Sequence, residues 1–181
     1  MAEPAIRELL ATDPNVELLW RAFELRPEPV PMIDPNSEYL RRVWSDSVAP
    51  MAERLGVTMK FPPVKPRTRM AHEAAHWARA QGRFEDYHDE TFRAFFERGE
   101  DIGDVDVLIS IAVRLNLDSQ SLRQALLNHE LAVSVLADEG EAARLGVSGV
   151  PAFIANRKAA LTGVQPVENL RKLIESVREA G

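Results

Sequence analysis

The middle of the chain carries apolar residues at helical spacing. Between Phe84 and Phe96, large apolar side chains recur at positions i, i+3 and i+4, and this spacing predicts an amphipathic helix. Two more segments repeat the pattern, each behind an aspartate that can cap a helix, Asp104 and Asp118. Ten of the twelve prolines lie in the first 66 residues, so helices can continue without interruption from about Thr68 to Leu145.

Two zones with strand-like composition bracket these helices, one near Val16–Leu25 and one over Ala152–Thr162. The pattern therefore predicts an α/β protein whose sheet is interrupted by an all-helical insertion. We place the sheet domain at residues 1–34 and 142–181, and the helical insertion domain at residues 35–141.

A glycine-framed loop leads into the second of these zones. Gly146 can end the preceding helix in a left-handed conformation, and Gly149 keeps the loop free of a side chain. Val150-Pro151 then opens the apolar run Ala152–Ala155, which a short polar turn over residues 156–158 follows. This order predicts a β-hairpin that begins at a proline.

The Val150-Pro151 bond is compatible with both a cis proline and an ordinary trans proline at an edge strand, because the cis penalty at proline is only about 0.5–1 kcal/mol. We expect the cis form, with Pro151 exposed to a groove between the sheet and the helical insertion. A cis bond would turn the backbone groups of Gly149 and Val150 outward, where an extended peptide or a thiol ligand can pair with them. Gly149, Val150 and Pro151 are therefore the predicted substrate-binding residues.

Composition narrows the classes of partner. The 181 residues carry a formal net charge of −6 and a sequence pI near 5.3. This charge disfavours nucleic acid as a partner, because nucleic acid requires a basic face. No apolar run approaches the roughly 20 residues of a membrane span, and no leader pattern is seen. We therefore expect a cytoplasmic protein with no membrane partner.

The hairpin and the helix after it resemble the cis-proline loop of the thioredoxin fold. Val150-Pro151 and its apolar strand are followed by Gly163 and by a helix that opens at Pro166 and has one apolar face. Within that superfamily the chain is similar to DsbA-type proteins of the FrnE branch and to their relatives, the 2-hydroxychromene-2-carboxylate isomerases. Val16–Pro29 resembles their second strand. Arg67–Arg83 resembles the start of their inserted helical domain, where an asparagine commonly stands at the place of Arg67.

The resemblance also shows what the chain lacks. That branch carries a Cys-x-x-Cys, or a serine nucleophile in the isomerases, between a first strand and a helix that often contains the segment Ala-Glu-Pro. Ala2-Glu3-Pro4 resembles that helix, which implies that the strand and the nucleophile lie upstream of Met1. No cysteine occurs among the 181 residues, and thiolate chemistry has no substitute in other side chains. We therefore predict no catalytic residue in this chain, and its status as an enzyme stays open.

The family activity that the resemblance implies is thiol–disulfide oxidoreduction or glutathione-dependent isomerisation. The implied partner is a thiol-containing peptide, protein or small molecule, with no bound cofactor and with glutathione as a candidate co-substrate. A homo-oligomer is compatible with the sequence. The alternative is a non-catalytic thioredoxin-like module that binds a peptide or a thiol at the Val150-Pro151 edge.

The first strand is central in the thioredoxin arrangement. Without it, the strands expected at Val16–Leu25 and Ala152–Ala155 should not pair directly. We expect the lane between them to be vacant or filled by another segment or chain.

One motif favours a different chemistry. His72-Glu73-Ala74-Ala75-His76 matches H-E-x-x-H, which on a helix places two imidazoles on one face and a general base between them, as in zinc hydrolases. The longer signature would need glycine at Arg79 and histidine at Gly82, and neither is present. We therefore predict no metal, with His72 and His76 one turn apart, lining the groove between the insertion and the sheet.

The segment Lys60–Pro66 fits a polyproline ligand motif, +xxPxxP, and more simply a stiff crossing into the helical insertion. Together with Arg67 and Arg69, its lysines form a local positive patch. This patch is either solvated surface or a site for an anionic ligand such as a glutathione carboxylate.

Overall fold

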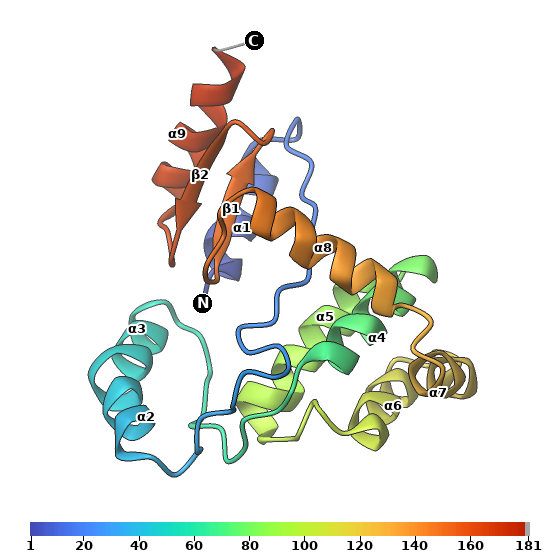
Figure 1. Cartoon of the computed structure of the whole chain (residues 1–181). Helices are drawn as coiled ribbons and strands as arrows, with labels where there is room; N and C mark the ends of the chain where they lie inside the picture. Colours follow the sequence, from blue (N-terminus) through green and yellow to red (C-terminus); the bar gives the residue numbers. More distant parts are fainter. Residues whose placement is uncertain (180–181) are drawn as a thin grey trace. The chain divides into compact units, whose positions relative to one another are not determined.

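A computed structural model describes residues 1–179 of the chain as a mainly helical protein with one β-hairpin (Figure 1). The elements in chain order are α1 (Glu3–Thr12), α2 (Glu38–Val43), the π-helical turn η1 (Trp44–Val48), α3 (Ala49–Arg54), α4 (Arg69–Ala80), α5 (Phe84–Phe92), the π-helical turn η2 (Arg93–Arg98), α6 (Val105–Arg114), α7 (Ser119–Leu127), α8 (Ala132–Arg144), β1 (Ala152–Ala155), β2 (Ala159–Thr162) and α9 (Val167–Arg178).

The chain forms two compact units. One comprises Met1–Arg21 and the residues from Gly140 onward, and the other comprises Ala22–Glu139. Helix α8 therefore contributes its end to the first unit and its earlier turns to the second. The sequence placed residues 1–34 and 142–181 in the sheet domain. In the structure, residues 22–34 belong to the helical part instead, and the second boundary lies at Gly140. We refer to the two parts as the hairpin unit and the helical unit.

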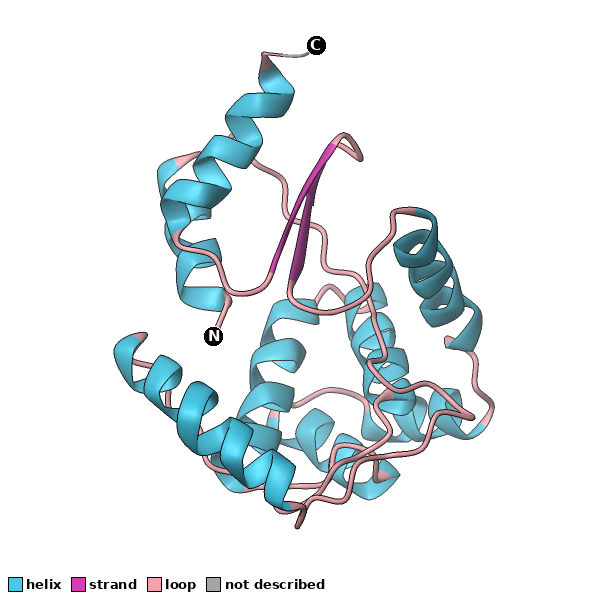
Figure 2. Ribbon diagram, turned by 60° about the vertical axis from the view of Figure 1, so that its left-hand side comes forward, coloured by secondary structure: helices cyan, strands magenta, loops and turns pink. Residues whose placement is uncertain are grey.

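In the hairpin unit, β1 and β2 pair antiparallel and pack against α9 (Figure 2). Phe153 and Leu161, which are directly opposite in the register, both contact the apolar face of α9. That face buries Leu170 and Leu173, and α1 packs beside it. The apolar residues after Pro166 thus lie on one face of a helix, as predicted, and that face covers one side of the hairpin.

The strand predicted at Val16–Leu25 is wrong, since this segment has no regular secondary structure. Among the described residues the sheet holds only β1 and β2, so Val16–Leu25 and Ala152–Ala155 do not pair directly, as predicted. The physical reason is that a strand is held by a neighbouring ladder and by packing more than by its own propensity. Without a partner ladder, Leu18 and Leu19 stay exposed.

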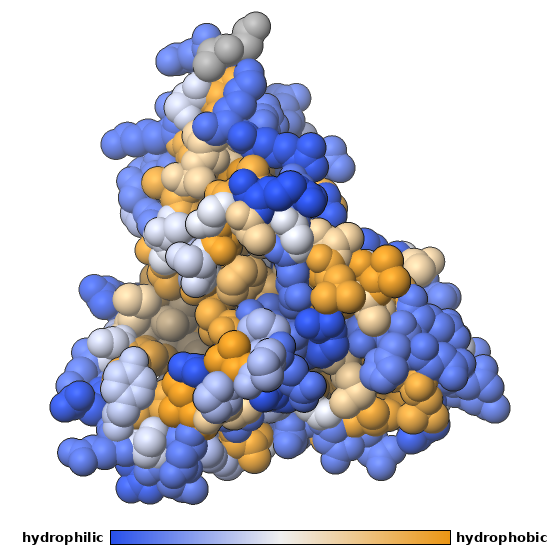
Figure 3. All heavy atoms as spheres, in the orientation of Figure 1, coloured by the Kyte–Doolittle hydropathy of each residue, from blue (hydrophilic) through white to orange (hydrophobic). Residues whose placement is uncertain are grey.

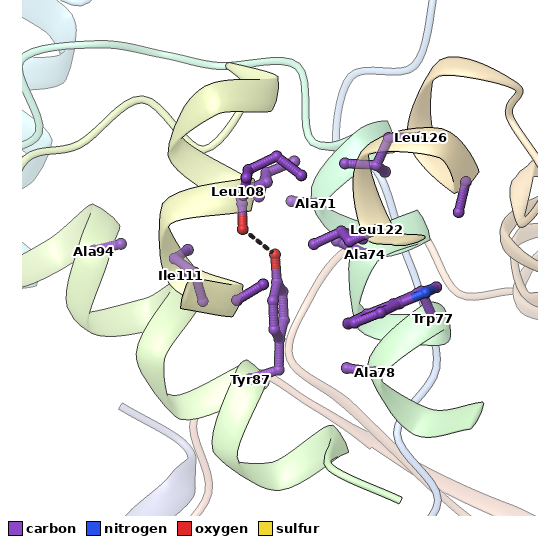
Figure 4. Packing of buried hydrophobic residues seen from close by; sticks show 13 residues of the cluster. Ala71, Ala74, Trp77, Ala78, Tyr87, Ala94, Leu108, Ile111, Leu122 and Leu126 are labelled. Carbon is purple, nitrogen blue, oxygen red and sulfur yellow. Dashed lines mark hydrogen bonds between the residues drawn. The ribbon is translucent and has the colours of Figure 1, made fainter. Parts of the chain in front are cut away.

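The helical unit has a single dense core built from α4, α5, α6 and α7 (Figure 4). Ala74 and Ala78 are fully buried, and these small residues let the neighbouring helices approach α4 closely. Tyr87 is also fully buried, and its hydroxyl donates a 2.8 Å hydrogen bond to the carbonyl oxygen of Leu108. Burial raises the pKa of the Tyr87 phenol, so it remains a neutral donor.

The predicted helix boundaries in this unit are confirmed. The Asp104 side chain accepts from the backbone of Asp106, and the Asp118 side chain accepts from two amides of the following turn. The helix that starts at Phe84 continues through η2 and ends at Gly99, whose φ is +73°. The predicted aspartates thus cap the starts of α6 and α7, while the left-handed Gly99 ends η2 without having been predicted.

Apolar side chains also reach the surface. Val133 and Leu136 on α8 are exposed, and Figure 3 shows an apolar patch over that helix. Within residues 1–179, no helix has the length and apolar character needed to cross a bilayer.

Candidate functional site

The loop before the hairpin is held at its first end by the cap of α8. Gly146 has a φ of +72°, its amide donates to the Ala143 carbonyl, and the Val147 amide donates to the Ala142 carbonyl. This pair of bonds is a Schellman motif, which satisfies the last carbonyls of the helix and turns the chain sharply. The predicted left-handed role of Gly146 is therefore confirmed.

At its other end the loop is held by the hairpin. The amide of Gly163 donates a 2.8 Å hydrogen bond to the carbonyl of Pro151, which extends the ladder by one residue beyond Ala152 and Thr162. The Val150-Pro151 peptide bond is cis. Pro151 is thus fixed to the sheet, while the residues before it are free of the ladder.

The three predicted binding residues lie together in this short loop. The Val150 side chain is 49% exposed, and no atom lies within 4 Å of the position that a Cβ would occupy on Gly149. Pro151 is partly buried. The loop therefore presents backbone groups and one apolar side chain, and it carries no ionisable side chain of its own.

An acidic residue near the end of α8 lies between two cations, one from the same helix and one from the hairpin turn. Arg157 lies 2.8 Å from one oxygen of Glu141, and Arg144 lies 2.6 Å from the other. The hydrogen bond from Arg144 lowers the pKa of Glu141 most, with the Arg157 charge adding to it. Glu141 is therefore ionised at neutral pH and joins the end of α8 to the turn.

The H-E-x-x-H motif lies on α4 of the helical unit, and its residues contact other groups of the protein. His76 Nε2 is 3.0 Å from Asp138 Oδ2, and the same Asp138 oxygen accepts a 2.9 Å bond from the amide of Ala22. His72 hydrogen-bonds the backbone of Phe23, and burial lowers its pKa. These contacts attach the extended segment 22–26 to α4 and α8.

Glu73, the expected general base of that motif, is fully buried. One of its oxygens is 3.4 Å from Nδ1 of His129, and the other has no hydrogen-bond partner. Among residues 1–179, no three histidine or acidic side chains are placed to hold a metal ion. The geometry therefore does not support zinc hydrolysis, and the motif clamps one segment of the helical unit.

The rest of this clamp is ionic. Arg69 donates from two nitrogens to one oxygen of the buried Glu24 and also pairs with Glu139 at 3.3 Å. Burial raises the pKa of Glu139, and the nearby Glu24 charge adds to the rise although Arg69 opposes it. Sequence reasoning missed this cluster because its acidic members lie far from α4 in the chain.

In the structure, the basic residues of the proposed anionic-ligand patch have different surroundings. Arg69 is paired as described, and Arg67 donates a 2.6 Å bond to the backbone oxygen of Arg26. Burial lowers the pKa of Lys65. The Lys60 amide bonds the carbonyl of Phe96, which fits a stiff crossing that is tied to η2.

Comparison with known proteins identifies the family. The profile of the DSBA-like thioredoxin domain matches residues 1–175, nearly the whole chain. The chain belongs to the DSBA-like thioredoxin domain family. The small antiparallel sheet and the helical insertion of the structure match this family's fold.

Solved structures agree with this assignment. The crystal structure of a probable DsbA oxidoreductase from Streptomyces coelicolor matches with a TM-score of 0.82 and 26% identity, covering 98% of this chain and 83% of that chain. A protein from Nitrosomonas europaea shares the fold, with a TM-score of 0.74 at 18% identity, covering 98% of this chain and 90% of that chain. The Streptomyces protein, a probable DsbA oxidoreductase by name, is thus a structural neighbour of this DSBA-like chain.

A curated relative is similar over a shorter stretch. The uncharacterized protein YwbO of Bacillus subtilis strain 168 is 41% identical over 115 residues. The match covers 62% of this chain and 58% of the length of YwbO.

Proposed function

We propose that this chain is the thiol-substrate binding part of a DsbA-type thiol–disulfide oxidoreductase. The observation that carries the proposal is the loop Gly149-Val150-Pro151, which is anchored at both ends and leaves Val150 half exposed before an antiparallel hairpin. Backbone groups at such a position can pair with an extended peptide that contains a cysteine. The name of the Streptomyces neighbour supports the oxidoreductase class.

Binding and chemistry are separate in this proposal. Disulfide exchange needs a thiolate as nucleophile, and the 181 residues contain no cysteine. The chain therefore recognises a thiol-containing peptide, protein or small molecule, and the redox-active thiols come from outside these residues. Glutathione is the smallest partner of this class, and we propose a cytoplasmic setting in which it is abundant.

The test is an NMR titration of the ¹⁵N-labelled chain with reduced glutathione and with an extended cysteine-containing peptide. We expect the amide signals of Gly149 and Val150 to shift in a saturable way. Val150→Asp should weaken binding at least tenfold, because it places a charge where an apolar contact is expected. Val113→Asp is the matched control, since Val113 is a similarly exposed valine on α6, and it should leave binding unchanged.

Two results would overturn the proposal. One is a titration in which neither thiol ligand shifts the loop amides, and the other is equal weakening by both variants. In a parallel assay, the chain should not accelerate the reduction of insulin by dithiothreitol, because it has no thiolate to exchange. An accelerated rate would contradict the division between binding and chemistry.

A further inference from the structure

A small pocket lies on the face of the hairpin that points away from α9. Phe153 and Leu161 contact α9, so the alternation of side chains along each strand puts Ile154 and Ala160 on the other face. These two residues and Leu145, just beyond the end of α8, contribute apolar lining to the pocket. All of its lining residues belong to the hairpin unit.

The pocket is large enough for a short apolar group. It has a volume of about 140 Å³. An apolar cavity of about 150 Å³ holds benzene, so this pocket has room for an apolar group of about six carbons. The side chain of Ala160 is exposed, and the pocket is therefore open to solvent along β2. A ligand can reach it directly from solution.

The rim of the pocket carries positive charge. Arg157 and Lys158 line it from the hairpin turn. The Nε of Arg157 lies 2.8 Å from an oxygen of Glu141, whereas the exposed Lys158 has no ion-pair partner within residues 1–179. An anionic group beside an apolar one is therefore the complementary ligand for this pocket.

Further cations lie close to this rim. Arg144 donates to one oxygen of Glu141 from two nitrogens. This hydrogen bonding lowers the pKa of Glu141 most, and the charges of Arg157 and Arg21 lower it further. Three cations, Arg144, Arg157 and Lys158, thus surround a single carboxylate, although the chain as a whole carries a net charge of −6. An added anion is attracted by the surplus of positive charge.

We propose that this pocket binds a small amphipathic anion, a free carboxylate attached to an apolar group of about six carbons. The apolar group fills the pocket, and the carboxylate accepts hydrogen bonds from Lys158 and from the guanidinium of Arg157. A guanidinium has several N–H donors, so Arg157 can serve Glu141 and the ligand at the same time. The site shares no residue with the loop over residues 149–151 and needs no thiol, so it goes beyond the proposed function.

An NMR titration of the ¹⁵N-labelled chain with hexanoate tests this proposal. The amide signals of Lys158, Ala159 and Ala160 should shift in a saturable way, while those of Gly149 and Val150 should not, which separates this site from the thiol-binding loop. Hexanol has the same carbon chain and no charge, and it should bind roughly tenfold more weakly. Butanoate should also bind roughly tenfold more weakly, because each methylene removed from water adds to the affinity.

Substitutions separate the contribution of the charge from that of the pocket. Lys158→Glu should weaken hexanoate roughly tenfold, because it reverses the charge at the rim. Ala160→Leu should weaken it to a similar extent, because the larger side chain fills the pocket. Lys172→Glu is the matched control for charge, since Lys172 is an exposed lysine on α9 of the same unit, and it should leave the affinity unchanged.

The proposal is refuted by any of four outcomes. The first is the absence of a saturable shift at the hairpin turn, and the second is binding of hexanol as tightly as hexanoate. The third is binding of acetate as tightly as hexanoate, because the rim would then hold an adventitious ion only. The fourth is equal weakening by Lys158→Glu and Lys172→Glu, which would trace the effect to the net charge of the chain.

Discussion

The hairpin turn stores backbone strain at an arginine, and this strain predicts the effect of a substitution. The Lys158 amide donates to the Ala155 carbonyl at 2.9 Å, and Asn156 and Arg157 between them have φ values of +48° and +58°. Positive φ at both central residues is the type I′ turn that joins twisted strands well. Asparagine tolerates this conformation, whereas arginine does not favour it.

Two opposing contributions set the difference in stability between a glycine and an alanine at the position of Arg157. A left-handed conformation costs a residue with a Cβ about 1–2 kcal/mol. Glycine removes that cost, but its greater freedom in the unfolded chain offsets about 0.5–1 kcal/mol of the gain. Arg157→Gly and Arg157→Ala both delete the same ion pair to Glu141, which keeps Arg144 as a partner. The glycine variant should therefore be more stable than the alanine variant by about 0.5–1 kcal/mol.

Urea unfolding of both variants measures this difference, with hydrogen exchange of the β1 and β2 amides as a readout of the hairpin unit. In thermal unfolding the same difference corresponds to about 1–4 °C. A second alanine variant, Asn156→Ala, should lose stability because it introduces the strain at the neighbouring position. Equal stability of Arg157→Gly and Arg157→Ala, or a less stable glycine variant, would refute the account of the turn.

Three further predictions concern the helical unit. Tyr87→Phe should lower stability by about 0.5–1.5 kcal/mol, measured by urea unfolding, because it deletes one buried hydrogen bond while Leu108 keeps its place in α6. Leu126→Ala should cost about 2–5 kcal/mol in the same assay through the cavity it leaves, while Leu127→Ala next to it, 64% exposed, should stay within about 0.5 kcal/mol. Glu139→Gln should become increasingly more stable than the parent as pH rises above 4.5. The pKa of Glu139 is raised on folding, so the parent is favoured below 4.5 and loses that stability as pH rises through the folded value. A gain that is the same at pH 4 and pH 8 would exclude this titration.

The sequence correctly predicted those elements that depend on interactions between residues close together in the chain. Asp104 and Asp118 cap their helices, and Gly146 takes the left-handed conformation, because each of these effects depends on a few neighbouring residues. The hairpin was predictable for the same reason, since its turn residues and apolar runs are adjacent. The cis bond at Glu28-Pro29 carried no signal that distinguished it from the other prolines of its segment.

Long-range features were beyond the reach of a single sequence. The apolar run Val16–Leu25 has the composition of a strand, but whether it becomes one depends on a neighbouring ladder. The histidines of α4 have the spacing of metal ligands, but His76 contacts Asp138, 62 positions later in the chain, and His72 hydrogen-bonds the backbone of Phe23. Nothing in the sequence around Asp138 indicates that its carboxylate joins an amide and an imidazole.

The clamp on α4 shows why a catalytic motif can serve structure alone. Segment 22–26 has no ladder to satisfy its backbone, and an unpaired buried donor or acceptor costs about 1–3 kcal/mol. Asp138 accepts from the Ala22 amide, His72 bonds the backbone of Phe23, and Arg67 donates to the Arg26 carbonyl, so side chains of α4, α8 and the proline-rich crossing replace the missing strand neighbours. The helical unit thus satisfies the backbone of its extended segment with side chains of its own.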